Sequence, residues 1–552
     1  MTATIPMLST MMDEPLTISQ ILWRIERIYP NKQVVTQRAE GEPRRSTYGE
    51  VARRARRLAS ALSRFGIEPG DRVATFAWNT QTHLECYFAI PCMGAVLHTI
   101  NVRLFDDQLD YIINHAEDRV IFCDRSVLPV LERLADKLSG VRLVVLMNAG
   151  PEPAGVLSNV IDYEEFLAGG DESFVWPSLD ERSAAAMCYT SGTTGNPKGV
   201  VYSHRSTMIH TLVAGLPNNM GISERDVVMY AVPMFHVNAW GMPFSSALNG
   251  ASQILSDRFL DPEHVLNLLD SEQVTVSAGV PTIWIGVLNL MQKTGRRLPR
   301  LRSIVSGGSA VPASVIDGFG KLGIELIHAW GMTEMSPLGT LTKLKSSMDS
   351  LSDAEKLAVL SKQGIIVPTV ECRIVDIDSG QALPWDGVAF GELQVRGPYI
   401  TSSYFHDPDA GEKFMDGWLR TADVATIDRE GYIQIVDRTK DLVKSGGEWI
   451  SSVELESTLM AHPKVLEAAV VGLPHPRWSE RPCAAVVLRS EYRDATTQDE
   501  LRDFLASRVA KWWLPDEYVF VDEIPKTSVG KFAKTRLREQ LAPVAARWAR
   551  GT

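Results

Sequence analysis

Several features that would mark a particular class of protein are absent from this 552-residue sequence. It contains only 6 cysteines, none in a Cys-x-x-Cys pair, and its 11 histidines form no cluster at metal-ligand spacing, so a zinc site is not expected. No apolar run reaches the roughly 18 residues of a membrane span. The amino terminus, which contains Asp13, Glu14 and Pro15, lacks the basic end and apolar core of a secretion signal. We therefore expect a cytoplasmic protein with reduced cysteines in its core.

An excess of positive charge is also lacking. The net charge of −11 argues against a nucleic-acid-binding protein, so an anionic ligand must be held by local positive groups. Apolar residues make up 45% and charged residues 22% of the chain, proportions that are ordinary for a soluble globular protein and argue against disorder as the main state. At about 100 to 200 residues per domain, the length predicts three or four structural units.

Short apolar segments alternate with amphipathic helices through the first part of the chain. Residues Thr47 to Glu50 form a capping box, after which apolar residues recur at helical spacing up to Phe65, and Gly66 ends the helix. The alternation predicts parallel sheets covered on both faces, an α/β fold in two similar lobes. Further helices are predicted over residues 83–88 and 106–116, and strands over residues 73–77, 95–100, 120–123, 227–232, 253–255, 274–277 and 304–305.

The pattern changes toward the carboxyl end. Strands over residues 372–377, 392–396 and 432–436 are separated by turns, which predicts a small β-rich subdomain. Strands over residues 468–471, 484–488 and 518–521, with a helix over 498–511, then predict an α+β terminal domain. Residues 437–441 carry four charges and are either an exposed linker or a hinge. The sequence thus predicts a large N-terminal domain over residues 1–436 (two α/β lobes plus the β-rich subdomain), a hinge over 437–441 and a mobile C-terminal domain over 442–552.

The segment from Tyr189 to Gly199, which lies between two apolar runs, has the composition of a phosphate-binding loop. Its three glycines allow backbone N–H groups to turn toward an anion, its four Ser and Thr residues add hydroxyl donors, and Lys198 adds a positive charge. The spacing differs from the Walker pattern, in which Gly, four residues and Gly-Lys-Ser/Thr follow one another. Taken alone, the segment is also compatible with a flexible turn between strands.

Five motifs, spread over most of the chain, carry a family resemblance. They are Tyr189 to Gly199, His328 to Glu334, Gly417 to Asp423, Asp437-Arg438 and Pro525 to Lys531. In this order they resemble the motifs of the acyl-adenylate-forming enzymes, which include acyl-CoA synthetases, peptide-synthetase adenylation domains and beetle luciferases. The segment from Lys444 to Ser452 is most similar to the medium- and long-chain fatty acid CoA ligases.

The resemblance implies a two-step reaction. A carboxylate attacks the α-phosphate of ATP to give an acyl-adenylate and pyrophosphate, and the thiol of CoA then displaces AMP. Because negative charge spreads over the departing pyrophosphate, the site needs backbone donors, cations and Mg²⁺. Thr333 is expected to donate to the α-phosphate and Glu334 to hold Mg²⁺. The β- and γ-phosphates are expected to contact Thr190, Ser191, Gly192, Thr193, Thr194, Gly195 and Lys198.

The resemblance also places the nucleoside. Asp423 is expected to accept both ribose hydroxyls, because a carboxylate offers two acceptor oxygens, and Arg438 to donate to the same sugar. Without the motif series these two residues would be interpreted as a turn aspartate and a surface ion pair. Trp330 is expected to stack on adenine where many relatives carry Tyr, a departure that keeps stacking but removes a hydroxyl. The other expected nucleotide contacts are Gly307, Gly308, Ser309, Ala329, Gly331, Met332 and Ile435.

The C-terminal domain is expected to supply groups to both steps. Lys531, in a Gly-Lys pair, matches the lysine that bridges the acid and the α-phosphate during adenylation. The same site must then admit CoA, so the domain is expected to rotate about the hinge at Lys440. The segment expected to face the site after rotation comprises Lys444, Ser445, Gly446, Gly447, Glu448 and Trp449, whose glycines would let the pantetheine arm pass.

The acyl pocket is expected along residues 233–241 and 278–282. Neither segment contains a carboxylate that could bind an amino group, which weakens the peptide-synthetase interpretation. His236 either transfers a proton or only walls the site, and Trp240 either gates an acyl tunnel or is a buried core residue. The predicted pocket residues are His236, Val237, Trp240, Gly241, Gly279 and Val280.

The identity of the acid is left open by the sequence. Each buried CH₂ contributes about 0.8 kcal/mol, so one or two side chains can change the preferred chain length. We expect a medium- or long-chain fatty acid first, then an aryl acid, then a short thio-substituted acid. A ligase that acts on a carrier protein, or a non-catalytic acyl- or nucleotide-binding protein, is the alternative. A homodimer is a further expectation, since an amino-terminal helix could pack on its own domain or on a partner through Ile18, Ile21, Leu22, Ile25 and Ile28.

Overall fold

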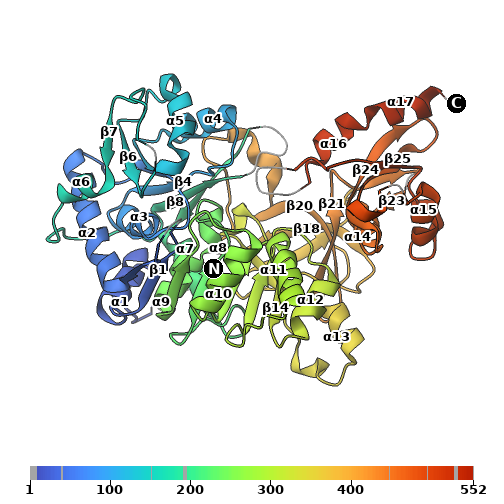
Figure 1. The fold of residues 1–552 in the computed structure, drawn as a ribbon, viewed down its shortest axis with the longest axis horizontal. Helices are drawn as coiled ribbons and strands as arrows, with labels where there is room; N and C mark the ends of the chain where they lie inside the picture. Colours follow the sequence, from blue (N-terminus) through green and yellow to red (C-terminus); the bar gives the residue numbers. More distant parts are fainter. Residues whose placement is uncertain are drawn as a thin grey trace, which may run out of the picture.

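The computed structural model of the chain describes residues 9–38, 41–150, 152–190, 196–446, 448–493, 495–526 and 532–550. Three parts follow one another across the molecule: a first lobe (blue), a second lobe (green and yellow) that continues into a β-rich part (orange), and a C-terminal domain (red) at one end (Figure 1). Mixed α/β architecture with a large N-terminal domain and a smaller C-terminal one confirms the predicted fold class.

The first lobe is built on a seven-stranded sheet with the order β7-β6-β5-β3-β4-β8-β9. Its strands are parallel except for β9, which pairs antiparallel to β8. Apolar side chains of α2 and α3 pack on one face and those of α4 on the other, as expected for strands with no solvent-facing side. The elements are β3 (Arg72–Phe76), β4 (Val96–Thr99), β5 (Val120–Asp124), β6 (Leu143–Met147), β7 (Val160–Asp162), β8 (Ala184–Tyr189), β9 (Gly199–Ser203), α2 (Tyr48–Phe65), α3 (Gln81–Cys92), α4 (Asp106–Ala116), α5 (Leu128–Arg133) and α6 (Tyr163–Ala168).

Helix α2 begins and ends where the sequence predicts. The Thr47 hydroxyl accepts the backbone N–H of Glu50 at 3.3 Å, and Gly66 ends the helix with φ of 87°. The Glu50 carboxylate takes a hydrogen bond from the Ser46 hydroxyl at 2.7 Å, which differs from the reciprocal contact of the predicted capping box.

The second lobe contributes the parallel half of a 14-stranded sheet. Two strands from the amino-terminal region, β1 and β2, extend its edge, which the sequence pattern did not reveal. Helices α10, α11 and α12 cover one face, and α7 and α9 lie on the face turned to the first lobe. The elements are α1 (Ile18–Arg27), β1 (Gln33–Thr36), β2 (Arg44–Thr47), α7 (His204–Gly215), β10 (Val227–Tyr230), α8 (Val237–Trp240), α9 (Met242–Asn249), β11 (Ser252–Leu255), α10 (Pro262–Ser271), β12 (Val276–Gly279), α11 (Pro281–Thr294), β13 (Ser303–Ser306), α12 (Ala313–Gly320) and β14 (Glu325–Gly331).

Strand β14 joins two kinds of sheet. Its first residues pair parallel with β13, and Ala329 to Gly331 pair antiparallel with β15 across an irregular register. The β-rich part therefore starts at Leu338 and is continuous with the second lobe, whereas the sequence placed its start near Cys372. The elements are β15 (Leu338–Leu341), α13 (Asp353–Leu360), β16 (Gly364–Ile366), β17 (Glu371–Val375), β18 (Phe390–Arg396), β19 (Phe414–Met415), β20 (Trp418–Ile427) and β21 (Tyr432–Arg438).

The C-terminal domain has a five-stranded sheet with an apolar core on each face. The helix predicted over residues 498–511 ends at Ala506, and Lys511–Trp513 form a separate 3₁₀ turn after the extended Ala510. The elements are β22 (Val443–Ser445), β23 (Glu448–Ile450), α14 (Ser452–Met460), β24 (Val465–His475), β25 (Ser479–Leu488), α15 (Gln498–Ala506), β26 (Glu517–Phe520), α16 (Lys534–Gln540) and α17 (Ala542–Arg550).

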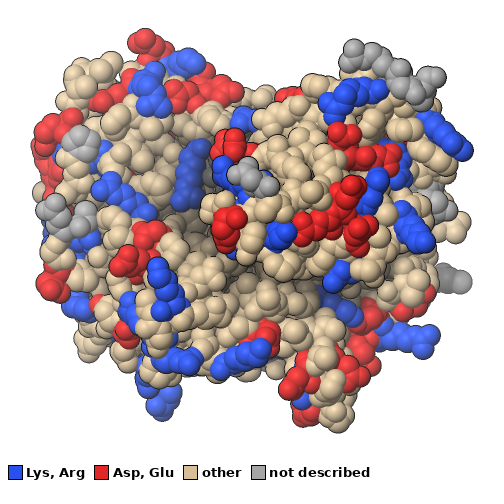
Figure 2. All heavy atoms as spheres, turned by 45° about the vertical axis from the view of Figure 1, so that its right-hand side comes forward, with Lys and Arg blue, Asp and Glu red and all other residues tan. Residues whose placement is uncertain are grey.

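The cysteines, possible metal ligands and apolar helices lie as follows in the structure. All six cysteines are free thiols, and five of them are buried while Cys372 is partly exposed, as expected for core residues. Among the described residues, no group of three or more His, Cys, Asp or Glu side chains is placed to hold a metal ion. No helix in the described ranges combines the length and apolar character that crossing a membrane requires. On the face shown in Figure 2, Lys and Arg are interspersed with Asp and Glu.

Candidate active site

The base of the predicted phosphate loop is closed by two hydrogen bonds between β8 and β9. The Thr190 N–H donates to the Lys198 carbonyl at 2.9 Å, and the Lys198 N–H donates to Thr190 Oγ1 at 3.0 Å. These bonds fix where the loop leaves and re-enters the sheet. The predicted contacts Ser191, Gly192, Thr193, Thr194 and Gly195 lie outside the described residues.

Residues 401–407, which follow β18, contact both Lys198 and Glu334, the charged residues that the sequence assigned to the phosphates and Mg²⁺. The Tyr404 hydroxyl donates to Glu334 Oε1 at 2.6 Å. Asp407 pairs with Lys198, with 2.9 Å between Oδ2 and Nζ, and the same ammonium lies 5.0 Å from the Tyr404 ring centroid. The Thr401 N–H also donates to the Glu334 carbonyl at 2.8 Å. Sequence reasoning missed this segment because it has no motif of its own.

Thr333 and Glu334 form a buried 3₁₀ turn directly after β14. They are only 9% and 7% exposed, and the Tyr202 hydroxyl of β9 donates to the Thr333 carbonyl at 2.7 Å. A carboxylate enclosed in this way keeps a fixed position, which suits a ligand for a cation shared with substrate phosphates.

The predicted ribose site lies between β14, β20 and β21. The Trp330 Nε1–H donates to Asp423 Oδ2 at 2.8 Å, and Arg438 Nε lies 3.2 Å from Asp423 Oδ1. Asp423 and Arg438 are directly opposite in the β20–β21 pair. The structure thus brings together three residues that are widely separated in the sequence, and it adds a Trp330–Asp423 hydrogen bond that the sequence did not predict.

Glycines border the same site where the backbone is crowded. A Cβ on Gly307 would lie 2.8 Å from the Ala329 carbonyl oxygen, and one on Gly331 would lie 1.9 Å from the Pro337 carbonyl oxygen. These two glycines therefore lie at the ends of β13 and β14, where a neighbouring backbone leaves no room for a side chain. Gly308 and Ser309 follow β13, Met332 follows β14, and Ile435 lies in β21. Trp330, Met332 and Ile435 pack against the same core.

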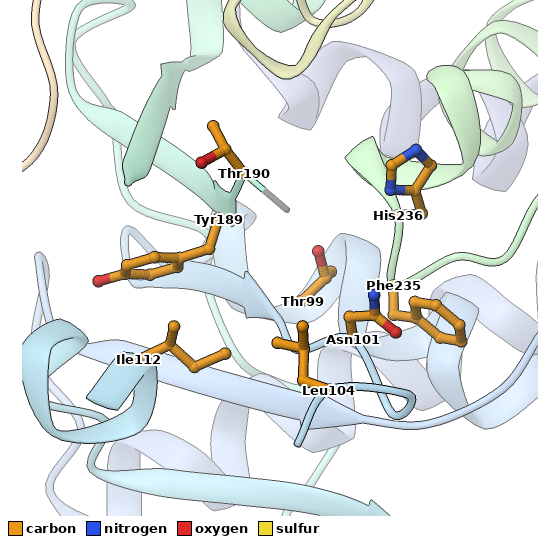
Figure 3. Close-up of a pocket in the computed structure, with 8 residues that line it drawn as sticks. All are labelled: Thr99, Asn101, Leu104, Ile112, Tyr189, Thr190, Phe235 and His236. Carbon is orange, nitrogen blue, oxygen red and sulfur yellow. The ribbon is translucent and has the colours of Figure 1, made fainter. Parts of the chain in front are cut away.

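His236 faces a small cavity between the lobes. The cavity holds about 20 Å³, roughly the space of one water molecule. Figure 3 shows Thr190 and His236 on opposite sides of it, with Thr99 and Asn101 between them. His236 is therefore close to the base of the phosphate loop, as both of its predicted roles require. The other lining residues are Leu104, Ile112, Tyr189 and Phe235.

The segment after His236, which the sequence assigns to the acyl pocket, is a left-handed turn. Residues Val237, Asn238, Ala239 and Trp240 have φ of 45°, 52°, 48° and 57°, and Gly241 continues the turn at 72°. Left-handed backbone costs roughly 1–2 kcal/mol per non-glycine residue, so the surrounding structure must impose it. Asn238 Oδ1 lies 3.4 Å from both Thr99 Oγ1 and Cys188 Sγ in the first lobe.

Two residues of the first lobe hold the start of the same segment. Asn79 Nδ2 donates to the carbonyls of Tyr230 and Val232 at 3.1 and 2.9 Å, and its Oδ1 accepts the Met234 N–H at 2.6 Å. The Tyr87 hydroxyl donates to the Met234 carbonyl. Sequence reasoning missed both residues, although a polar Asn three residues after a buried strand is a signal that could have been followed.

Close packing also surrounds the glycines of the predicted acyl pocket. A Cβ on Gly241 would lie 2.6 Å from His210 Cε1, and one on Gly279 would lie 3.0 Å from Trp284 Cζ2. Burial lowers the pKa of His210 to about 4, so this imidazole is neutral at pH 7. Trp240 is 9% exposed, and Val280 directly follows β12.

The connector of residues 437–441 is partly buried: Asp437 and Asp441 are buried, whereas Arg438 and Lys440 are exposed. Asp437 is fully buried at the end of β21, and the N–H and hydroxyl of Ser452 donate to its Oδ2 at 2.5 and 2.6 Å. Arg538 of α16 pairs with Asp441 at 2.8 Å and donates to the Lys440 carbonyl at 3.0 Å. Burial lowers the pKa of Lys440.

The segment predicted to serve the CoA step forms the hairpin β22–β23. The Gly446 N–H donates to the Trp478 carbonyl at 2.8 Å, and a Cβ on Gly446 would lie 2.9 Å from the Trp478 ring. Lys444 Nζ lies 4.6 Å from the Trp449 ring centroid. Ser445 pairs with Glu448 across the hairpin, whereas Gly447 and Lys531 lie outside the described residues.

Two family models and several known proteins match this chain. A family model described as AMP-binding enzyme matches residues 22–405, and one described as AMP-binding enzyme C-terminal domain matches residues 454–531. The chain is 48% identical to a long-chain-fatty-acid–CoA ligase of Thermus thermophilus, over 96% of this chain and 97% of that protein. It is 46% identical to a 3-methylmercaptopropionyl-CoA ligase of Ruegeria lacuscaerulensis (97% and 99% covered) and 44% identical to a medium-chain-fatty-acid–CoA ligase of Ectopseudomonas oleovorans (98% and 99% covered).

Solved structures resemble the whole chain. The anthranilate CoA ligase AuaEII in complex with anthranoyl-AMP superimposes with a TM-score of 0.85 at 26% identity, covering 97% of this chain and 99% of that one. ATP-bound MatB from Rhodopseudomonas palustris superimposes with a TM-score of 0.80 at 27% identity, covering 96% and 99%.

Proposed function

The chain belongs to the AMP-binding enzyme family and is an ATP-dependent acyl-CoA synthetase that works through an acyl-adenylate, and from this premise we propose that its acid is a medium- or long-chain fatty acid. The observation that carries the proposal is the apolar character of the segment after His236. Val237, Ala239 and Trp240 are buried there beside Met234, with no charged side chain among residues 230–241 to bind a polar acid. Two of the relatives named above are fatty acid CoA ligases.

A short thio-substituted acid is the second candidate. The relative at 46% identity, which falls between the two fatty acid ligases at 48% and 44%, is a 3-methylmercaptopropionyl-CoA ligase. Such an acid would also fit an apolar pocket, because a thioether is nearly as hydrophobic as a methylene chain. An aryl acid is the third candidate, and the cavity of about 20 Å³ beside His236 is too small for an aryl and a fatty acyl group alike, so the choice between them rests on the activity measurement.

For the adenylation step we propose that the positive and donor groups converge on the departing pyrophosphate. Lys198 and the Thr190 hydroxyl stand at the base of the phosphate loop and would bind the β- and γ-phosphates. Thr333 would donate to the α-phosphate. A single buried carboxylate, Glu334, with Tyr404 on one oxygen, fits Mg²⁺, which prefers oxygen ligands and shares substrate phosphates. When bound, the ion would neutralise charge on these phosphates.

For the nucleoside we propose that Asp423 accepts the ribose hydroxyls while Arg438 donates to the sugar. Trp330 and the glycine segment Gly307-Gly308 would enclose adenine. Arg438 lies 3.2 Å from Asp423, so it would have to share the carboxylate with the sugar or move to a hydroxyl.

For the thioester step we propose rotation of residues 442–552 about a hinge at Lys440, within the boundaries predicted from the sequence. In one orientation Lys531 would bridge the acid and the α-phosphate. In the other, the hairpin of Lys444 to Trp449 would face the site and admit CoA. β21 includes Asp437 and Arg438, so the two residues that open the predicted hinge are part of a strand, and the pivot would fall after them.

Two further proposals concern the oligomeric state and the cellular location. The apolar set of α1 packs on its own domain, since Ile18, Ile21, Leu22 and Ile25 are at most 2% exposed. Trp23 and Ile28 of the same region are 54% and 50% exposed and could support a homodimer, which sedimentation at micromolar concentration would test. The cytoplasmic location remains a prediction from the sequence.

The test is carboxylate-dependent exchange of pyrophosphate into ATP across a graded panel of acids. The panel comprises straight-chain acids from short to long, 3-methylthiopropionate and benzoate, followed by detection of the acyl-CoA product with free CoA. Fatty acids of medium or long chain should give the highest kcat/KM. Highest activity with 3-methylthiopropionate would establish the second candidate instead, and exchange without product from free CoA would indicate a carrier-protein acceptor.

A further inference from the structure

The indole N–H of Trp330 is directed at the carboxylate that would bind the ribose. Nε1 lies 2.8 Å from Asp423 Oδ2, whereas Arg438 Nε lies 3.2 Å from Oδ1. We propose that Trp330 is a positioning residue, which uses its N–H to orient Asp423 for the ribose diol. This inference rests on the proposed ATP site, and it assigns to Trp330 a role beyond stacking on adenine.

The carboxylate is held but not saturated by these contacts. An ionised carboxylate has about four lone-pair positions, of which the Trp330 hydrogen bond occupies one while the Arg438 ion pair lies against the other oxygen. Two positions remain for the two hydroxyls of a ribose. Asp423 is 7% exposed, and its own N–H donates to Thr421 Oγ1 at 3.1 Å, which fixes the backbone from which the carboxylate projects.

Packing fixes the direction in which the indole points. A Cβ on Gly339 would lie 2.7 Å from Cζ3 of Trp330, so the six-membered ring rests directly on the Gly339 backbone. Trp330 lies at the irregular register where β14 pairs with β15. With the six-membered ring held there, the pyrrole edge that carries the N–H faces β20 and Asp423.

Charge makes this bond stronger than an ordinary one. A hydrogen bond to an ionised acceptor contributes more than a neutral pair, and one made in a nearly buried site is less weakened by water. A phenylalanine at position 330 would keep an aromatic face but offer no donor to Asp423. The Trp330→Phe substitution therefore separates the two roles.

The experiment measures binding of ATP and of 2′,3′-dideoxy-ATP to the wild type and to Trp330→Phe. If Trp330 acts through Asp423 and the ribose hydroxyls, the substitution should weaken ATP binding about tenfold. It should change binding of the dideoxy nucleotide less than twofold, because that ligand lacks the diol. In pyrophosphate exchange the KM for ATP should rise by a similar factor while kcat changes little. Trp385→Phe, at a tryptophan that is 44% exposed, is the matched control and should alter neither ligand.

A double substitution tests whether Trp330 acts through Asp423. In an Asp423→Ala background, Trp330→Phe should cost no further ATP affinity, since there is no carboxylate left to orient. An equal loss for both nucleotides, or a full additional loss in the Asp423→Ala background, would show that Trp330 only stacks and would overturn the inference. Neither result would affect the proposed function, which fails instead if the wild type shows no acid-dependent pyrophosphate exchange.

Discussion

The Nζ atom of Lys534 lies 2.7 Å from Oε1 of Glu456, and both side chains are nearly enclosed, at 10% and 8% exposure. Lys534 also donates to the Ser452 hydroxyl at 2.6 Å, and Ser452 in turn donates to Asp437 at the end of β21. The attraction of Glu456 and Asp437 outweighs burial and raises the pKa of Lys534. This buried cluster ties α16 and α14 of the C-terminal domain to β21, the strand that leads into the predicted hinge.

Removing the positive charge of Lys534 from this cluster should destabilise the C-terminal domain. Lys534→Met leaves Glu456 and Asp437 buried without a positive partner, so the free energy of unfolding of the C-terminal domain should fall by about 3–5 kcal/mol. Urea unfolding followed by tryptophan fluorescence measures this loss. Lys464→Met is the matched control, because the Lys464–Glu500 pair is 26% and 34% exposed and should contribute less than about 1 kcal/mol. Equal losses in the two variants would contradict a structural role for the cluster.

The left-handed turn after His236, in the predicted acyl pocket, predicts a specific effect of Gly241→Ala. Gly241 and Gly295 both have φ of 72°, but a Cβ would meet His210 at position 241 and nothing within 4 Å at position 295. Both substitutions carry the backbone cost of roughly 1 kcal/mol, and only Gly241→Ala adds a clash of about 1–3 kcal/mol.

Because the clash displaces the turn that contains Trp240, Gly241→Ala should also change the chain length of acid that gives the highest kcat/KM. Gly295→Ala should leave that preference unchanged. The measurement is the exchange assay over the same series of acids, and an unchanged preference in both variants would place the turn outside the acyl pocket.

The ion pair between Lys198 and Asp407 predicts opposite effects for its two partners. Their side chains are 41% and 24% exposed, so the pair itself contributes only about 1 kcal/mol or less. Lys198→Met should raise the KM for ATP about 10- to 100-fold, because a charge-assisted contact to phosphate is lost. Asp407→Asn frees Lys198 from a competing carboxylate and should tighten ATP binding about two- to fivefold. Weaker ATP binding in Asp407→Asn would mean that Asp407 positions Lys198 instead of competing with phosphate.

Some of these relationships could be predicted from the sequence and others could not. The helix over residues 106–116 was predicted to the residue, because its apolar period and its ends are local signals. The reaction was predicted because each motif is contiguous. In contrast, Tyr404 and Glu334 are 70 residues apart, Trp330 and Asp423 are 93 apart, and β1 pairs with a strand more than 200 residues away. Only tertiary packing brings such partners together, and only packing imposes positive φ on Val237.

Acid should destabilise the fold partly through buried neutral histidines. Burial lowers the pKa of His83 to about 4, from about 6.5 in an unfolded chain. A lowered folded-state pKa means that the unfolded state binds more protons between these values, so this contribution to stability is complete above pH 6.5 and is lost as pH falls toward 4.

The His83→Gln variant should therefore show a shallower fall in unfolding free energy between pH 6.5 and 4, by up to about 1.4 kcal/mol per pH unit. Asp257, whose pKa burial raises to about 7, acts with the opposite sign but is present in both proteins and cancels in the difference. Urea titrations at several pH values provide the measurement, and equal slopes for variant and wild type would contradict the assignment.

If the C-terminal domain adopts two orientations, one substitution should block formation of the acyl-adenylate without blocking formation of the thioester. Lys531→Ala should abolish formation of the acyl-adenylate, because it removes the cation that would bridge the acid and the α-phosphate, and it should leave thioester formation from pre-made acyl-adenylate and CoA largely intact. Single-turnover assays of each half-reaction measure this. Lys526→Ala is the matched control, since Lys526 pairs with Glu467 at 2.6 Å near the start of the same segment and should affect neither step. Equal loss of both half-reactions in Lys531→Ala would contradict a domain that presents different groups in the two steps.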